Sequence, residues 1–425
     1  MREEKTNRQR RRSRRVRNQI FAYLTLIVLI VLVLTGGYFG ISYIIDYVNK
    51  YNDKVNKVIE EAESSAALES VDESDDIEVS NNNVQYEEGY TPLIEGDQLK
   101  QLVESLLNEM TTEEMVAGMF IVSPESITGV ETVIQAEEGT RTAITENPVG
   151  GIIYAPKNFK SPEQFTQMLT NTKGFSKYPL FTAVRAECGT KDFGLEATAK
   201  ASELTDVNDV VQAYGSVAAK LVSYGINMDF APVADIVSGE SETTLQDRIF
   251  GSDVSVVSPL VNASVQSVQS AKVSAVLLKF PSILEQSKSL EELKNSEFIV
   301  YDAAIKSGVD CIMVSHVKAS SITGDDTLSS FSSVLIQDIL RNTLGFDGVV
   351  MTDSLSDSVV TGQYSSAEAA VAAIQAGADL LLEPAEYQEA YEGVLQAVTD
   401  GTIPKERIYE SIYRIYRVKY KNALE

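Results

Sequence analysis

The most constraining feature of the sequence is a series of eight short apolar runs, each followed by a segment with helical periodicity. The runs are Gly118–Val122, Gly150–Tyr154, Pro179–Val184, Asn227–Pro232, Val273–Pro281, Asp310–Val317, Phe346–Asp353 and Ala378–Pro384. They are continuous rather than alternating, as expected for a parallel sheet that helices cover. Their spacing of about 30 to 47 residues fits a strand, a loop and a return helix. We therefore predict an α/β fold, a TIM (β/α)8 barrel.

The competing architecture is an open, doubly wound sheet, which usually carries a glycine-rich phosphate loop. Neither G-x-G-x-x-G nor G-x-x-x-x-G-K-[ST] occurs in the chain. Between the runs, apolar residues at i, i+3 and i+4 predict helices at Val207–Tyr224, Ser333–Leu344 and Ser366–Ala376. The last segment, Glu406–Lys421, is predicted to be the closing helix, with its Arg and Tyr residues on a solvated face.

The N-terminal part predicts a membrane anchor. Residues 1–19 hold nine basic side chains and two acids, and residues 20–45 contain no charged side chain. An apolar stretch of 26 residues is long enough to cross a bilayer, and it exceeds the apolar core of a cleavable signal peptide. Basic residues on its N-terminal flank favour a cytoplasmic N-terminus, so everything after residue 46 is expected to be extracytoplasmic. A nucleic-acid-binding tail is the weaker interpretation of the basic run.

Residues 46–96 are predicted to form an acidic stalk. Residues 60–97 contain 13 acidic side chains and neither Lys nor Arg, a composition that favours an extended spacer. An ordinary solvated segment of the folded domain is the alternative. From residue 97 to 425 the composition is that of a globular domain.

The composition excludes several classes of site. The chain has a formal net charge of -25, which argues against nucleic acid as a partner. One histidine, His316, and two cysteines, Cys188 and Cys311, cannot assemble a zinc, haem or iron–sulfur site, so no metal or cofactor is expected. Buried thiols are the default interpretation of the two cysteines, although their pairing is left open.

Carboxylates dominate the predicted carboxyl ends of the strands, where the chemistry of a TIM barrel belongs. These ends carry Arg185, Glu187, Asp229, Asp235, Lys279, His316, Asp353 and Glu383. A pair of carboxylates at a barrel mouth suits glycoside hydrolysis, with one as nucleophile and the other as proton donor. Each acid taken singly could instead be a loop or capping residue.

Several motifs, in order, resemble glycoside hydrolase family 3, in its β-N-acetylhexosaminidase branch. Met110–Phe120 reads M-T-T-E-E-M-V-A-G-M-F, and Val149–Tyr154 is similar to the second strand of the family. Asn227–Asp235 with Arg248–Gly251 resembles N-x-x-F-A-P-V-x-D and R-x-F-G. Gly345–Leu355, followed by Ala376–Asp379, resembles the nucleophile strand and the strand after it. The resemblance covers nearly all of residues 97 to 425.

The resemblance implies roles for individual residues. Asp353 takes the position of the aspartate that attacks the anomeric carbon, while Arg248 and His316 take positions that contact the sugar. Asp235, Lys279 and Glu187 are further substrate-binding candidates. The implied ligand is a β-linked N-acetylhexosamine or cell-wall glycan, for which peptidoglycan is the natural source outside the membrane.

The departures from the family pattern concern catalysis. Where the family has D-Q-E-G-G, this chain has Arg185-Ala-Glu-Cys-Gly189, so a cation replaces an acceptor. Where the family has K-H-F-P-G-H-G, the chain reads Leu278–Leu284, without that lysine and both histidines. The following loop, which carries the Asp-His proton donor in this branch, is cut to Glu285–Leu290. Loss of a positioned general acid typically costs about 10²- to 10⁴-fold in rate.

Two hypotheses follow from these departures. The first is a membrane-anchored, non-catalytic barrel that binds a cell-wall glycan or a protein partner. The second is an active β-glycosidase with Asp353 as nucleophile and a relocated acid, for which Glu187, Glu285 and Glu291 are the candidates.

Overall fold

The computed structural model describes residues 94–196, 198–236, 246–282 and 288–421. The predicted basic tail at 1–19 and apolar anchor at 20–45 lie outside these residues, as does nearly all of the predicted stalk at 46–96. Among the described residues, no helix is both long and apolar enough to span a membrane. The described residues all belong to one compact unit.

Eight parallel strands form a closed barrel within the described residues, in the order β1 to β8 with β8 paired to β1. The strands are β1 Phe120–Val122, β2 Gly151–Ile153, β3 Phe181–Val184, β4 Met228–Asp229, β5 Ser274–Phe280, β6 Cys311–Val314, β7 Val349–Ser354 and β8 Leu380–Leu382. Seven of them lie inside a predicted run and β7 extends one residue past its run, to Ser354, which confirms the TIM barrel. The strands are almost entirely buried because the barrel interior and the outer helices cover their two faces.

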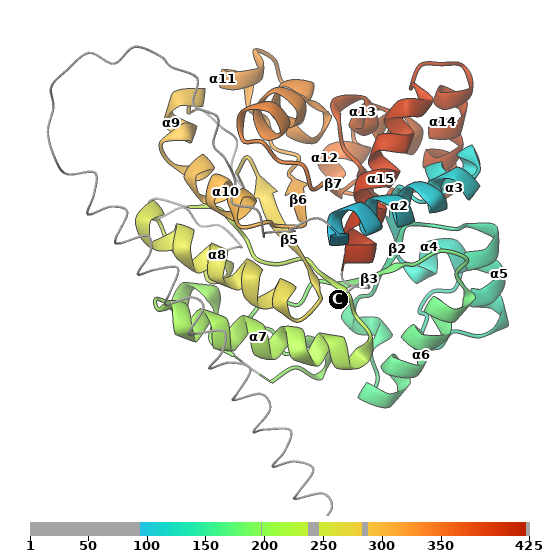
Figure 1. The fold of residues 1–425 in the computed structure, drawn as a ribbon, viewed down its shortest axis with the longest axis horizontal. Helices are drawn as coiled ribbons and strands as arrows, with labels where there is room; N and C mark the ends of the chain where they lie inside the picture. The colour runs from blue at the N-terminus through green and yellow to red at the C-terminus, as the bar shows by residue number, and fades with distance from the viewer. Residues whose placement is uncertain (1–93, 197, 237–245, 283–287, 422–425) are drawn as a thin grey trace, which may run out of the picture. The chain divides into compact units, whose positions relative to one another are not determined.

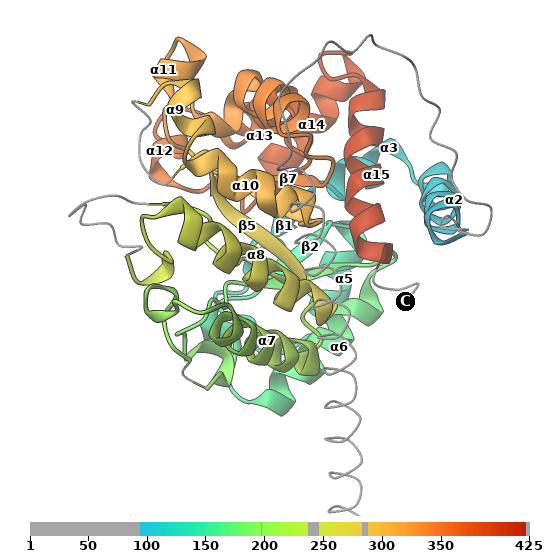
Figure 2. The ribbon, with the colours of Figure 1, turned by 60° about the vertical axis from the view of Figure 1, so that its left-hand side comes forward.

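Helices surround the barrel on its outside (Figures 1 and 2). The longer ones are α2 Ile94–Glu109, α5 Glu138–Glu146, α6 Pro162–Phe175, α7 Val207–Tyr224, α8 Val254–Ser270, α10 Glu297–Lys306, α13 Ser366–Ala376, α14 Tyr387–Thr399 and α15 Lys405–Lys421. Shorter ones are α3 Thr112–Ala117, α4 Pro124–Thr128, α9 Leu290–Lys294, α11 Ser320–Thr323 and α12 Ser358–Thr361. The predicted helices at Val207–Tyr224 and Ser366–Ala376 are confirmed residue for residue.

Local signals explain these boundaries. Helix α7 starts after Asp206, whose side chain accepts from the Asn208 amide, and it ends at Gly225 in the left-handed conformation. The predicted helix at Ser333–Leu344 is present at Val334–Thr343, but with the wider π-helical hydrogen-bond pattern. Its end shows this pattern directly, because the Leu344 amide donates to the Ile339 carbonyl five residues earlier.

Helix α15 crosses the amino-terminal end of the barrel. Its side chains reach residues that precede three successive strands: Arg407 and Arg414 contact Asp379 before β8, Arg417 contacts Asp347 before β7, and Lys421 contacts Asp310 before β6. Its apolar side chains, Ile408, Ile412 and Ile415, are buried. The prediction of a closing helix is thus correct, but the prediction that its arginines form a solvated face is wrong. The acidic residues at the strand starts draw the arginines inward.

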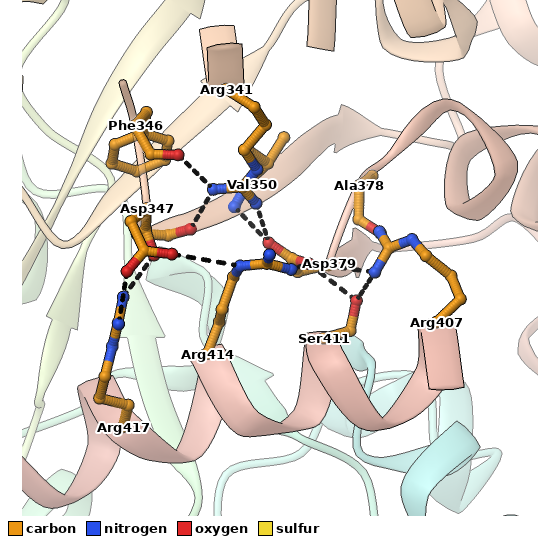
Figure 3. A network of polar contacts seen from close by, with 11 residues as sticks. Arg341, Phe346, Asp347, Val350, Ala378, Asp379, Arg407, Ser411, Arg414 and Arg417 are labelled. Carbon is orange, nitrogen blue, oxygen red and sulfur yellow. Dashed lines mark hydrogen bonds and ion pairs between the residues drawn. The ribbon is translucent and has the colours of Figure 1, made fainter. Parts of the chain in front are cut away.

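Asp379 is the centre of this contact (Figure 3). The carboxylate is completely buried and forms ion pairs with Arg341, Arg407 and Arg414. It also accepts hydrogen bonds from the Ser411 hydroxyl at 2.7 Å and the Val350 amide at 3.0 Å. Burial alone would raise the pKa of Asp379, but the three guanidinium groups outweigh it and hold that pKa below its usual value. The network joins β7, β8 and α15 at the end of the barrel opposite to the strand carboxyl ends.

Candidate active site

The carboxyl ends of the strands bring the predicted site residues to one rim of the barrel. Asp353 lies near the end of β7, Lys279 near the end of β5, and His316 just after β6. Lys279 and Glu383 both have a left-handed backbone, with φ of 79° and 42°. The register shifts in the adjoining β5–β6 and β7–β8 pairs. Such backbone conformations are costly for residues other than glycine and cluster at functional sites, where they aim side chains.

Asp353 is held from two sides. Its Oδ2 accepts a hydrogen bond from the Lys279 ammonium at 2.5 Å, and its Oδ1 accepts one from the Ser354 amide at 2.9 Å. Both side chains of the ion pair are about one fifth exposed, at 22% for Lys279 and 21% for Asp353. Burial raises the pKa of Asp353, but the charge and the hydrogen bond of Lys279 outweigh this effect and lower the pKa overall. Asp353 is therefore a carboxylate at neutral pH, the form that a nucleophile needs.

Replacing Lys279 with methionine is expected to raise the pKa of Asp353, because burial is then opposed only by weaker effects such as the hydrogen bond from the Ser354 amide. The titration of the Asp353 carboxyl carbon, followed by ¹³C NMR and assigned with an Asp353→Asn variant, measures this directly. Lys160→Met, at an exposed lysine, is the control and should leave the titration unchanged. An unchanged titration in Lys279→Met would contradict the electrostatic role of Lys279.

His316 is buried and bonded through both ring nitrogens. Nε2 donates to the Ser354 carbonyl at 3.0 Å, so Nδ1 accepts from the Ser330 hydroxyl at 2.7 Å. Burial lowers the pKa of His316 in spite of the nearby Asp353 charge, which keeps the ring neutral at pH 7. In this arrangement the ring supports the residue that follows Asp353. Its predicted contact with a sugar stays a prediction.

Arg248 and Glu187 form the second ion pair of the rim. The guanidinium binds both carboxylate oxygens of Glu187, with Nε to Oε2 at 2.6 Å and Nη2 to Oε1. Burial lowers the pKa of Arg248, but the hydrogen bond and the charge of Glu187 outweigh burial and raise the pKa overall. The charge of Asp353 adds a smaller increase, so Arg248 is also within electrostatic range of Asp353. The structure therefore brings Arg248, Glu187, Lys279 and Asp353 together as two ion pairs.

The three acids proposed as relocated proton donors have different surroundings. Glu187 engages both oxygens with Arg248, so protonation would break a bidentate pair. Glu291 is 76% exposed on α9 and pairs with Lys294. Glu285 lies outside the described residues.

Asp235 is buried and accepts hydrogen bonds from the Ser282 hydroxyl and the Ile236 amide, which ties the loop after β4 to the loop after β5.

Asp229, at the end of β4, lies beneath the rim. It is completely buried; Oδ1 accepts from the Ala186 amide, and no donor among the described residues reaches Oδ2. Burial raises its pKa from 3.8 to about 7. A group this far from solvent cannot meet a substrate, so Asp229 acts on stability rather than on chemistry.

Replacing Asp229 with asparagine should make the protein more stable relative to the parent as the pH rises. The unfolded carboxyl ionises near pH 4, whereas the folded one stays protonated until about pH 7. The free energy of unfolding of the parent therefore falls by about 1.4 kcal/mol per pH unit across this window, whereas Asp229→Asn has no such loss. Urea unfolding at pH 4.5, 6 and 7.5 measures the difference between the two proteins. A difference that does not change with pH would show that the raised pKa is wrong.

A third ion pair spans the rim from β3 to β8. The Arg185 guanidinium reaches the Glu383 carboxylate at 3.2 Å, past β1 and β2, which lie between these strands. The pair borders a pocket of about 210 Å³ that the loops after β1 and β2 also line. Sequence reasoning placed Arg185 and Glu383 at strand ends but missed this pairing. It also missed Lys157 and Phe193, which line the same pocket and carry no signal in the sequence, and Tyr154, which ends a predicted strand run but was not considered as a site residue.

The cysteines and acidic residues give no metal site in the described part of the chain. Cys188 and Cys311 are both buried free thiols, so they are not paired with each other. No group of three or more His, Cys, Asp or Glu side chains among the described residues is arranged to hold a metal ion.

Comparison with known proteins gives consistent matches. The family model described as "Glycosyl hydrolase family 3 N terminal domain" matches residues 111–418. A β-hexosaminidase from Hydrogenovibrio crunogenus is 27% identical over 299 residues, which are 65% of this chain and 81% of the relative. A β-hexosaminidase from Tolumonas auensis is 29% identical over 274 residues, which are 59% of this chain and 79% of the relative.

A solved structure adds a likeness in three dimensions. The glycoside hydrolase family 3 β-N-acetylglucosaminidase from Paenibacillus sp. matches with a TM-score of 0.69 and 28% identity. The match covers 74% of this chain and 63% of that protein, so the chain spans somewhat less than two thirds of it.

Proposed function

Because this chain belongs to the family of the glycosyl hydrolase family 3 N-terminal domain, we propose that its barrel binds glycans ending in a β-linked N-acetylhexosamine, with Asp353 placed as the nucleophile. The domain is β-hexosaminidase-like, and the relatives named above are β-hexosaminidases. The observation that carries the proposal is the ionised Asp353 between Lys279 and the Ser354 amide at the barrel rim.

Catalysis by this site is weak for ordinary glycosides. Attack by a carboxylate expels the leaving group as an anion unless a nearby acid protonates it. Of the relocated acids proposed from the sequence, Glu187 is bound by Arg248 and Glu291 lies on an exposed helix. We expect Asp353 to react only with sugars that carry a very good leaving group. With natural glycans the domain acts mainly as a binding module, and a protein partner is the other ligand class to test.

The leaving-group dependence of hydrolysis tests this proposal. With a series of aryl β-N-acetylglucosaminides, kcat/KM should fall steeply as the pKa of the phenol rises, because no acid assists its departure. A flat dependence would mean that a general acid is present, and the domain would then be an ordinary retaining glycosidase. Glu285→Gln, compared with Glu291→Gln, would then show whether the acid lies in the segment 283–287.

The placement of the domain is a separate part of the proposal. The apolar run at 20–45 and its basic flank support a single-pass membrane anchor with a cytoplasmic N-terminus and an extracytoplasmic barrel. A cell-wall glycan, such as peptidoglycan, would then be the accessible ligand. Protease treatment of intact cells should degrade the barrel but spare a tag placed before residue 20. Degradation of the tag alone would reverse the orientation.

A further inference from the structure

A pocket beside the candidate nucleophile is lined by two cations, Lys157 and Arg185, each in an ion pair with a glutamate, and the proposed sugar ligand alone does not explain them. It measures about 210 Å³ and lies at the carboxyl ends of β1, β2, β3 and β8. Its walls include Lys157, Arg185, Glu125, Glu383, Tyr154 and Phe193. Glu383 follows Leu382, which pairs with Ser354 in the register of β7 and β8. The edge of the pocket is therefore next to the strand end that carries Asp353.

Arg185 is held in place by its neighbours, but not all of its hydrogen-bond donors are used. Its guanidinium lies over the Phe230 ring, at 5.4 Å from the ring centroid, and two of its nitrogens share the single Oε2 of Glu383 at 3.2 and 3.3 Å. A guanidinium has five N–H donors, so most of its capacity is left for a ligand. The side chain is 45% exposed, which leaves it accessible from the pocket.

Lys157 provides a second cation in the lining of the pocket. Its ammonium is 3.6 Å from Glu125 Oε1, a distance too long for a hydrogen bond, and its side chain is 49% exposed. The same Glu125 oxygen accepts hydrogen bonds from the Asn158 side chain at 2.7 Å and the Val133 amide at 3.0 Å. Glu125 thus holds the loop after β1 to the loop after β2 and pairs with Lys157 by charge alone, so the N–H donors of the ammonium are available to a ligand.

We propose that this pocket binds a carboxylate carried by the sugar that sits beside Asp353, with Arg185 and Lys157 as its two contacts. A guanidinium matches the planar geometry of a carboxylate, and such charge-assisted hydrogen bonds are roughly twice as strong as neutral ones. The inference rests on the proposed glycan function and narrows it to carboxylate-bearing N-acetylhexosamines. The carboxylate could be a lactyl ether at O3 or a uronate at C6, which share this chemistry.

Binding of matched acids and amides tests the pocket. The full-length chain in non-ionic detergent is titrated calorimetrically with N-acetylmuramic acid, with N-acetylglucosaminuronic acid, with the primary amide of each, and with N-acetylglucosamine as the uncharged parent sugar. We expect at least one acid to bind about tenfold or more tightly than its own amide, which is the difference between a charged and a neutral hydrogen bond. The acid that is preferred identifies the position of the carboxylate on the ring.

Three variants locate the effect. Arg185→Gln should abolish the preference for the acid and Lys157→Gln should weaken it, whereas Lys160→Gln, at an exposed lysine three residues away, should preserve it. The urea midpoint of unfolding shows whether each variant is folded. If Arg185→Gln does not fold, Lys157→Gln alone tests the pocket. Equal binding of acid and amide, or a preference that survives both variants, overturns the carboxylate pocket alone. Failure of all four sugars and of N-acetylglucosamine to bind overturns the proposed glycan function as well.

Discussion

Replacing Asp379 with asparagine is expected to lower the free energy of unfolding by about 3–5 kcal/mol, because it leaves buried cations without their partner. Arg341, Arg407 and Arg414 surround this one carboxylate, and their side chains are 9%, 16% and 22% exposed. Asparagine keeps the size of the side chain, but it removes the charge and retains only one of the two acceptor oxygens that Ser411 and Val350 use separately. Such a loss is a large part of the roughly 5–15 kcal/mol that stabilises a typical protein.

Asp347→Asn is the matched control, since Asp347 belongs to the same network but is 71% exposed. Pairs this exposed contribute about 1 kcal/mol or less, so the control should unfold almost like the parent in urea. The pKa of Asp379 is lowered in the folded state, so its contribution is present above the unfolded pKa and is lost only as the pH falls through the lower, folded value. The deficit of Asp379→Asn should therefore be constant from pH 5 to 8. Equal deficits for the two variants would disprove the central role of the buried carboxylate.

Replacing Asp353 with asparagine should reduce the hydrolysis of an activated aryl β-N-acetylglucosaminide by roughly 10⁴-fold or more, since the loss of a nucleophile removes the covalent step. The release of phenol by the parent and the variant measures the effect. Asparagine also removes the partner of the Lys279 ammonium, whose side chain is 22% exposed, so the unfolding midpoint must be measured beside the rate.

The control for this variant is Asp338→Asn, at an exposed aspartate on the outer π-helical segment, which should hydrolyse the substrate at the parental rate. A substrate with a dinitrophenyl leaving group gives the site its best chance of turnover, because this group departs without protonation. If Asp353→Asn retains the parental rate, the nucleophile assigned by family resemblance is wrong. Mass spectrometry of the parent with a 5-fluoro glycosyl fluoride would then locate the residue that does react.

The sequence predicted the scaffold well because its signals are local. Each strand is a run of apolar residues that two covered faces require, and a helix such as α7 is delimited by its own Asp206 and Gly225. Helix α15 shows the limit of such signals. Its arginines read as a solvated face in the sequence, yet Asp379 and Asp347 at the starts of two strands bind them. Periodicity indicates which residues share one face of a helix, but it does not indicate whether that face contacts solvent or another part of the protein.

The sequence by itself determined the eight-stranded barrel and the family, because both depend on motifs of residues close together in the chain, and it predicts Asp353 as the nucleophile. Only the tertiary structure decided which charges neutralise one another. Lys279 and Asp353 are 74 residues apart, Arg248 and Glu187 are 61 apart, and Arg185 and Glu383 are 198 apart. Closure of the barrel brings the ends of all strands to one rim, where a charge selects its partner by distance and burial rather than by sequence separation.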